Sequence, residues 1–123
     1  MPLTISSTYH NTIILNNPTA QNPATVTSTG LISVVNGGGV YGTAGYAWTL
    51  SNLGTIAGNG TLHDGVDLTA GGSVTNGQSG SAGGYIKGNY GGILIKGGAG
   101  TVKNLGQFPE RGGGESTSYP VAA

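Results

Sequence analysis

The sequence predicts an all-β fold, a right-handed, single-stranded parallel β-helix (β-solenoid) of about four coils with three short strands each. Glycine occupies 26 of the 123 positions. Apolar residues recur with a step of 26 or 27 residues, and short β-branched segments are separated by Asn-Gly and Gly-Gly corners. Stacked coils of short strands joined by tight turns are the fold that fits all three observations.

Composition excludes the main competing fold classes. A glycine in a helix interior costs about 1 kcal/mol relative to alanine, so a chain this rich in glycine is not a typical helical domain. Disordered segments usually carry high charge and few β-branched residues. Here Lys and Arg total 4, Asp and Glu total 4, and Val, Ile and Thr recur regularly. The pattern favours an ordered β-structure.

The first apolar column follows the pattern small, apolar, any residue, apolar. Its first apolar members, in chain order, are Ile13, Val40, Val66 and Ile93, separated by 27, 26 and 27 residues. Strand side chains alternate between two faces. We therefore expect these four residues to point into the solenoid, and the residues that follow them, Ile14, Tyr41, Asp67 and Leu94, to point outward.

Two further columns complete each coil. The second is expected to align Val26, Leu50, Val74 and Val102, followed by an asparagine-rich ladder of Ser28, Asn52, Asn76 and Asn104 at one bend. The third follows a glycine and aligns Ile32, Ile56, Ile86 and Phe108. The spacing places an insertion of about six residues within Gly77 to Gly83. A repeat near 26 residues is longer than the roughly 18 residues of a left-handed coil made of three hexapeptides, which favours the right-handed form.

The regularity of the columns sets the predicted boundaries. Residues 13–108 are expected to form the solenoid. Residues 1–12 are expected to be an N-terminal cap with apolar contacts from Leu3, Ile5 and Tyr9, because a solenoid end exposes unpaired backbone. Residues 109–123, which begin Pro109-Glu110-Arg111 and break the pattern, are expected to be an irregular or disordered tail.

Two strings, Asn52-Leu53-Gly54-Thr55-Ile56 and Gly97-Gly98-Ala99-Gly100-Thr101-Val102, give the coils a likeness to known proteins. The coils resemble the β-helical passenger stems of bacterial autotransporter-like surface proteins, and the chain is similar to the opening coils of such a stem. The resemblance implies a secreted or cell-surface structural or adhesive role, and it carries over no catalytic residue.

Charge and residue usage limit the classes of partner and site that the sequence can support. The formal net charge is zero, and Lys87, Lys96, Lys103 and Arg111 are scattered, so no basic stripe is available for nucleic acid. Without cysteine there is no disulfide, thiolate zinc site or thiol catalysis. We expect no cofactor and no metal site. No apolar run reaches the roughly 20 residues of a transmembrane helix, and the N-terminus does not have the pattern of a signal peptide.

Few groups could support catalysis. His63, Asp64 and Asp67 lie within five residues, but an acid–base or metal site would need a further group from a neighbouring coil, where Thr, Ser and Gly predominate. We interpret this segment as a solvated corner. Glycoside hydrolysis in its common form needs two converging carboxyl groups, and Glu110 and Glu115 belong to the predicted tail. The sequence therefore predicts that the protein is not an enzyme.

The aromatic residues are the candidate ligand surface. They are Tyr41, Tyr46, Trp48, Tyr85 and Tyr90. One interpretation is packing at corners and stacking between coils, and the other is a surface that stacks on sugar rings. Tyr41, in the outward row, is the best candidate for the second role.

These observations lead to one functional hypothesis and one alternative. The hypothesis is a non-enzymatic structural or adhesin-like β-solenoid module, located outside the cell or on a bacterial cell surface, which associates with like solenoid coils or with surface glycans. Ile14 and Leu94, apolar at outward positions, favour lateral packing. The alternative is a carbohydrate-binding or polysaccharide-processing β-helix.

Overall fold

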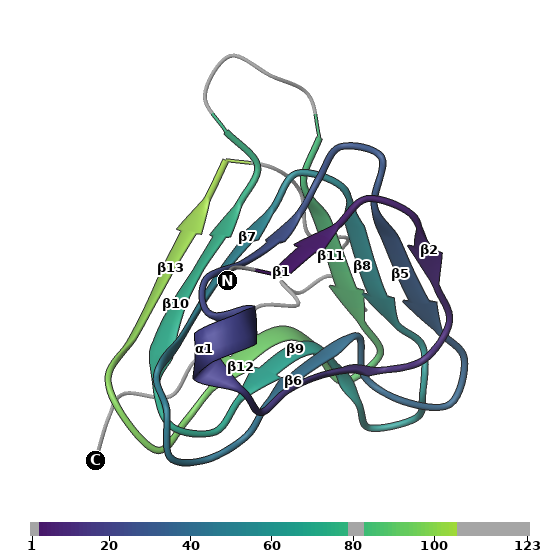
Figure 1. The fold of residues 1–123 in the computed structure, drawn as a ribbon. Coiled ribbons are helices and arrows are strands. Elements are labelled where there is room, and N and C mark those ends of the chain that lie inside the picture. The colour runs from purple at the N-terminus through teal and green to yellow at the C-terminus, as the bar shows by residue number, and fades with distance from the viewer. Residues whose placement is uncertain (1–2, 79–82, 106–123) are drawn as a thin grey trace.

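The computed structural model describes residues 3–78 and 83–105, and it confirms the predicted fold class. The chain is 53% strand and 4% helix and makes a β-solenoid of about four turns. Figure 1 looks along the solenoid and shows three sheets around a triangular cross-section. The chain passes clockwise through the three sheets as it recedes from the viewer, which is the right-handed sense.

Each coil contributes one strand to each of three parallel sheets. Sheet A contains β1 (Leu3–Ile5), β4 (Ala24–Val26), β7 (Trp48–Asn52), β10 (Gly72–Asn76) and β13 (Gly100–Asn104). Sheet B contains β2 (Thr8–Tyr9), β5 (Leu31–Val34), β8 (Thr55–Gly58) and β11 (Tyr85–Gly88). Sheet C contains β3 (Ile13–Leu15), β6 (Val40–Gly42), β9 (Asp64–Leu68) and β12 (Gly91–Ile95). Strands of one sheet are therefore one coil apart in sequence.

The register of sheets B and C confirms the first and third columns. In sheet C, Ile13 is level with Val40, Val66 and Ile93 in turn. In sheet B, Ile32, Ile56 and Ile86 are level and fully buried. Each such side chain contributes about 1.5–3 kcal/mol through removal from water, so the inward rows form the core. Phe108 lies outside the described residues.

Sheet A confirms the second column only in part. Val74 is level with Leu50 and Val102 as predicted, but Val26 is level with Asn52. The corner after β4 runs from Thr27 to Gly30 and closes with a hydrogen bond of 2.9 Å from Gly30 N to Thr27 O. The corner after β7 contains only Leu53 and Gly54. Because the earlier corner is longer, the predicted pairing of Val26 with Leu50 is wrong by two residues.

An asparagine ladder lies inside the bend between sheets A and B, with Asn52 and Asn76 fully buried and Asn104 at its exposed end. Asn52, Asn76 and Asn104 are level, while Ser28 lies in the longer corner and does not take part. Asn52 Nδ2 donates to Asn76 Oδ1 at 2.9 Å, and Asn76 Nδ2 donates to Asn104 Oδ1 at 3.1 Å. Asn76 Nδ2 also donates to Gly84 O at 3.0 Å, and Gly54 N donates to Asn52 Oδ1 at 3.1 Å. The ladder thus ties the coils together and holds the corner backbone.

The N-terminal residues belong to the solenoid. β1 pairs with β4 and β2 pairs with β5, both in parallel, so the stack begins at Leu3 rather than at Ile13. The described part of the predicted cap, from Leu3 onward, therefore belongs to the first coil and pairs with the edge of the next one. Residues 109–123, the predicted tail, lie outside the described residues.

One short helix, α1 (Pro18–Gln21), was not predicted; it interrupts the corner between β3 and β4. Asn17 caps it, with Oδ1 accepting hydrogen bonds from Thr19 N at 3.1 Å and Ala20 N at 3.3 Å. Within the described residues no helix has the length and apolar character to cross a membrane.

Trp48 fills the core at the corner from sheet C to sheet A. It has no exposed surface, and its Nε1 donates to Thr43 O at 3.1 Å. Gly42 stands in the inward row between Leu15 and Leu68, and a Cβ there would lie 2.6 Å from Trp48 Cδ1. The small residue in the row therefore makes the space that the indole occupies.

Candidate ligand groove

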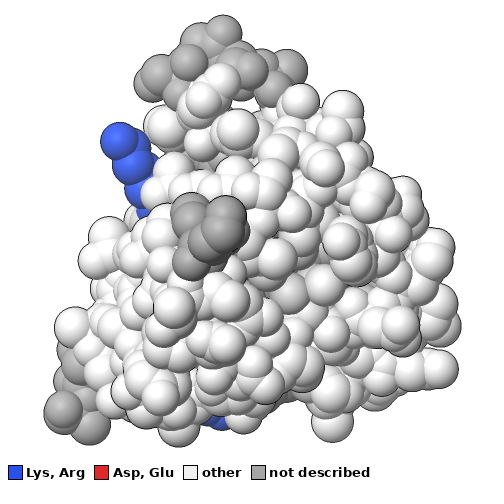
Figure 2. Space-filling model, in the orientation of Figure 1, with Lys and Arg blue, Asp and Glu red and all other residues white. Residues whose placement is uncertain are grey.

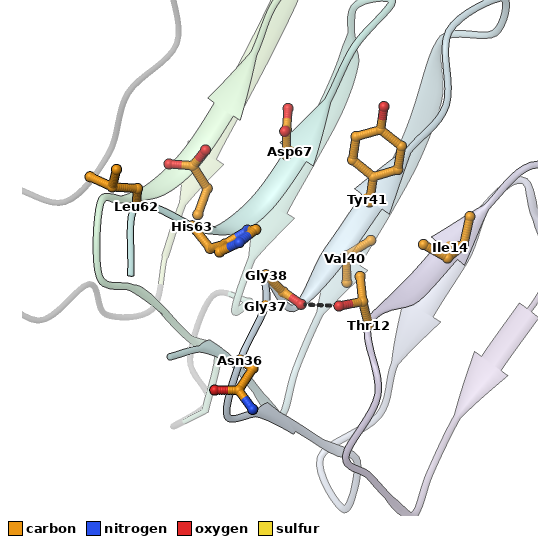
Figure 3. A pocket seen from close by; sticks show the side chains of 11 residues that line it. Thr12, Ile14, Asn36, Gly37, Gly38, Val40, Tyr41, Leu62, His63 and Asp67 are labelled. Atoms are coloured by element: carbon orange, nitrogen blue, oxygen red, sulfur yellow. Dashed lines mark hydrogen bonds between the residues drawn. The ribbon is translucent and has the colours of Figure 1, made fainter. Parts of the chain in front are cut away.

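A groove of about 350 Å³ lies where sheet B turns into sheet C. Three consecutive coils line it, and the close-up in Figure 3 shows how their side chains are arranged. The lining residues are Thr12, Ile14, Asn36, Gly37, Gly38, Val40, Tyr41, Leu62, His63, Asp64 and Asp67. One wall is fixed by Thr12 Oγ1, which donates to Gly38 O at 2.8 Å. The groove thus combines apolar, aromatic and acidic side chains.

Strand register places three of these side chains in one row. Ile14 on β3 is level with Tyr41 on β6, and Tyr41 is level with Asp67 on β9. Figure 3 shows the three projecting to the same side of the sheet. Neighbouring strands are about 4.8 Å apart, so an aliphatic chain, an aromatic ring and a carboxylate follow one another across the coils.

Asp64 and Asp67 each carry a buried carboxylate oxygen that lacks a partner. Asp64, the first residue of β9, is only 7% exposed, so its interpretation as part of a solvated corner is wrong. Among residues 3–78 and 83–105, neither Oδ1 of Asp64 nor Oδ1 of Asp67 has a hydrogen-bond partner. An unsatisfied buried polar atom costs about 1–3 kcal/mol, and more when the group is charged. The groove therefore contains two acceptors that hydrogen-bond donors would stabilise.

Burial shifts both acids in the same direction. Loss of hydration is the largest cause that raises the pKa of Asp64 from 3.8 to about 6, and the charge of Asp67 adds to it. Lys96 and His63 act in the opposite direction. Burial also raises the pKa of Asp67, again against Lys96 and His63. Protonation or a donating ligand would relieve either carboxylate.

The structure separates the five predicted aromatic residues. Only Tyr41, which is 37% exposed, lines the groove. Tyr46 packs edge-on against Trp48, with ring centroids 5.7 Å apart and planes at 70°. Because Trp48 is fully buried, its predicted place on a ligand surface is wrong. Tyr85 is half-buried on sheet B, and Tyr90 is exposed at the corner before β12. The five do not form one surface.

Sequence reasoning missed the corner residues of the groove, notably Asn36, Gly38 and Leu62. They belong to no column, and their place depends on how consecutive corners stack. The available signal was the outward row, in which Tyr41 and Asp67 fall at the same position of successive coils.

The groove does not have the ligand set of a metal centre. Within residues 3–78 and 83–105, no three His, Cys, Asp or Glu side chains come together to hold a metal ion. Comparison of the chain with protein-family models, curated proteins and solved structures found no match.

Proposed function

We propose that this chain is a non-enzymatic structural or adhesive β-solenoid module that works outside the cell or on a bacterial cell surface and associates with like coils. One observation carries the proposal. All three sheets are continuous parallel ladders, in which each strand pairs with the strand one coil away. A stack of this kind can accept a further coil at either end.

The N-terminal edge is suited to such pairing. Leu3 N donates to Pro23 O, and Ile5 O accepts from Thr27 N, so these groups face the second coil. Backbone groups of successive strand residues alternate in direction, so the N–H of Thr4 faces away from it. Natural edge strands are commonly protected by charged side chains. Figure 2 shows this end of the molecule with Lys and Arg only at its margin and no Asp or Glu.

Sedimentation velocity over a wide concentration range tests this proposal. The parent protein is expected to form larger species as concentration rises. Thr4→Pro, which removes an outward N–H at an exposed position, is expected to remain monomeric, while Thr4→Val keeps the N–H and is expected to associate like the parent. A parent protein that stays monomeric at all concentrations would contradict end-to-end association.

The groove supports a second candidate function, carbohydrate binding. Tyr41 presents an exposed ring beside the carboxylate of Asp67, and sugar recognition commonly pairs an aromatic face with polar acceptors. On a glycan array, Tyr41→Ala is expected to lose binding that the parent shows. Tyr90→Ala removes a more exposed tyrosine that does not line the groove, and it is expected to bind normally. Absence of binding by the parent would refute this candidate.

A further inference from the structure

We propose that the groove binds an amino sugar, with the ring face against Tyr41 and the protonated amine held between Asp64 and Asp67. The inference rests on the second candidate function, carbohydrate binding, and it adds the chemical class of the ligand. Three features of the groove lead to it: buried acceptors, two carboxylates with no lysine among the lining residues, and apolar walls.

The two carboxylates of the groove favour a ligand that donates hydrogen bonds. Oδ1 of Asp64 and Oδ1 of Asp67 have no partner among the described residues. Asp64 is more than nine-tenths buried and lines the groove, so bulk water does not hydrate it as it hydrates a carboxylate on the surface. The Thr12 hydroxyl already donates to Gly38 O. The part of the chain that the structure describes therefore does not supply the donors that these oxygens lack.

Charge selects an ammonium group over a neutral hydroxyl. Of the residues that line the groove, two are carboxylates and none is a lysine. Lys96 acts on both acids from outside this lining. The Lys87 amine is held elsewhere, 2.8 Å from Asn59 Oδ1 and 3.3 Å from Asn89 Oδ1. Hydrogen bonds between ions are roughly twice as strong as neutral ones. A divalent cation fits less well: His63 also lines the groove, but no three His, Cys, Asp or Glu side chains of the described residues come together to hold a metal ion.

The apolar walls favour an amine that is carried on a sugar ring over a small free amine. Tyr41 offers an exposed aromatic face, and Ile14 and Leu62 are exposed apolar side chains on either side of the acids. Aromatic faces attract cations and pack against apolar C–H groups. The volume of about 350 Å³ lies at the lower end of the roughly 300–1,000 Å³ typical of small-ligand sites. One or a few sugar rings match this size and character.

Binding should depend on pH, because the acceptors must be ionised to hold an ammonium group. The groups that act on Asp64 are Asp67 on the same strand, His63 before it and Lys96 after β12. Of the other neighbouring strands, β6 contributes the Tyr41 phenol and β11 the Lys87 amine. Affinity is expected to weaken as pH falls below about 6, where Asp64 takes up a proton, and to weaken again above neutral pH as the sugar amine loses its own.

Isothermal titration calorimetry with three short oligosaccharides tests the inference on the full chain near pH 7. The probes are an oligomer of glucosamine, its fully N-acetylated counterpart and a neutral glucose oligomer. The parent is expected to bind the glucosamine oligomer at least about tenfold more tightly than the other two. Asp64→Asn and Asp67→Asn are expected to remove this preference, Tyr41→Ala to weaken all binding, and Tyr90→Ala to change nothing.

The other outcomes identify which step fails. Equal affinity for the glucosamine and N-acetylated oligomers would overturn the amine preference and leave carbohydrate binding intact. Binding of methylamine as tight as that of the glucosamine oligomer would overturn the role of the ring. Binding of none of the probes would overturn both the inference and the candidate function on which it rests.

Discussion

Two clusters of buried polar side chains in this solenoid differ in whether their hydrogen bonds are satisfied. Between sheets A and B, Asn52 and Asn76 are fully buried. Asn52 donates to Asn76, Asn76 donates to Asn104, and both amides also donate to corner carbonyls. At the start and middle of β9, Asp64 and Asp67 each keep a buried oxygen without a hydrogen bond. The first cluster completes its bonding within the chain, and the second does not.

The difference indicates what each region is for. A satisfied buried network fixes one structure, because any other arrangement leaves polar atoms unpaired. Unsatisfied charged groups cost stability, and such groups are characteristic of sites that bind or react. We therefore infer that the asparagine ladder belongs to the structural frame, meaning the coils and their buried core, and that the acidic groove is the region that can bind a ligand.

The largest expected effect comes from placing an acid in the frame. Val74 lies fully in the core of sheet A, between Leu50 and Val102. Val74→Asp would bury a charge without access to the groove, so we expect a loss of about 4 kcal/mol or more, enough to unfold the stack. Circular dichroism during thermal unfolding measures it. An unchanged transition would remove the register described here.

Replacing an asparagine of the ladder by alanine is expected to cause the next largest loss of stability. Asn76→Ala removes the Oδ1 that accepts from Asn52 Nδ2 and the Nδ2 that donates to Gly84 O, and it should cost about 3 kcal/mol. Asn104→Ala, at the exposed end of the ladder, should cost clearly less. Urea denaturation of both variants compares them, and equal losses would contradict a ladder that is strongest at its buried centre.

Replacing the acid Asp64 in the groove should raise the stability of the protein rather than lower it. Asp64→Asn eliminates a buried charge without a partner and is expected to stabilise the protein by about 2 kcal/mol near pH 7. The raised pKa means that the folded state holds the Asp64 proton more tightly than the unfolded state. Parent stability should therefore rise as pH falls through about 6 towards 3.8.

Urea denaturation at several pH values measures both statements. The variant should lose most of the rise that the parent shows in this window. A parent that becomes less stable between about pH 6 and pH 4 would show that Asp64 has a partner that favours its charged form.

The smallest effect is expected at Lys96. This exposed lysine follows β12 and lowers the pKa of both acids. Lys96→Gln should move the titration of Asp64 to higher pH and change stability by less than about 0.5 kcal/mol. Carboxyl chemical shifts followed across pH measure the movement, and a shift to lower pH would contradict the assigned influence.

Much of the frame could be predicted from residue spacing. Ile13, Val40, Val66 and Ile93 recur at nearly equal intervals because the corners between them nearly balance in length. Where one corner is longer, as from Thr27 to Gly30, spacing alone misplaces Val26 by two residues. Sequence columns therefore predict register only where corner lengths are conserved between coils.

The groove was less predictable for a different reason. Strand alternation places Tyr41 and Asp67 on the same outward row, and this part follows from sequence. The burial of Asp64 does not, because it depends on how the stacked corners around Asn36 and Leu62 close over the start of β9. Trp48 was likewise misjudged, since its burial depends on the space left by Gly42 one strand away.

The most direct test of this account is a carboxyl NMR titration of the two aspartates, with and without the glucosamine oligomer. In the free protein Asp64 should titrate near pH 6. With the oligomer bound, its pKa should fall, because the ammonium group stabilises the ionised form. A free-protein titration near 3.8 that the oligomer leaves unchanged would mean that the carboxylates are already satisfied, and it would contradict the distinction between frame and groove.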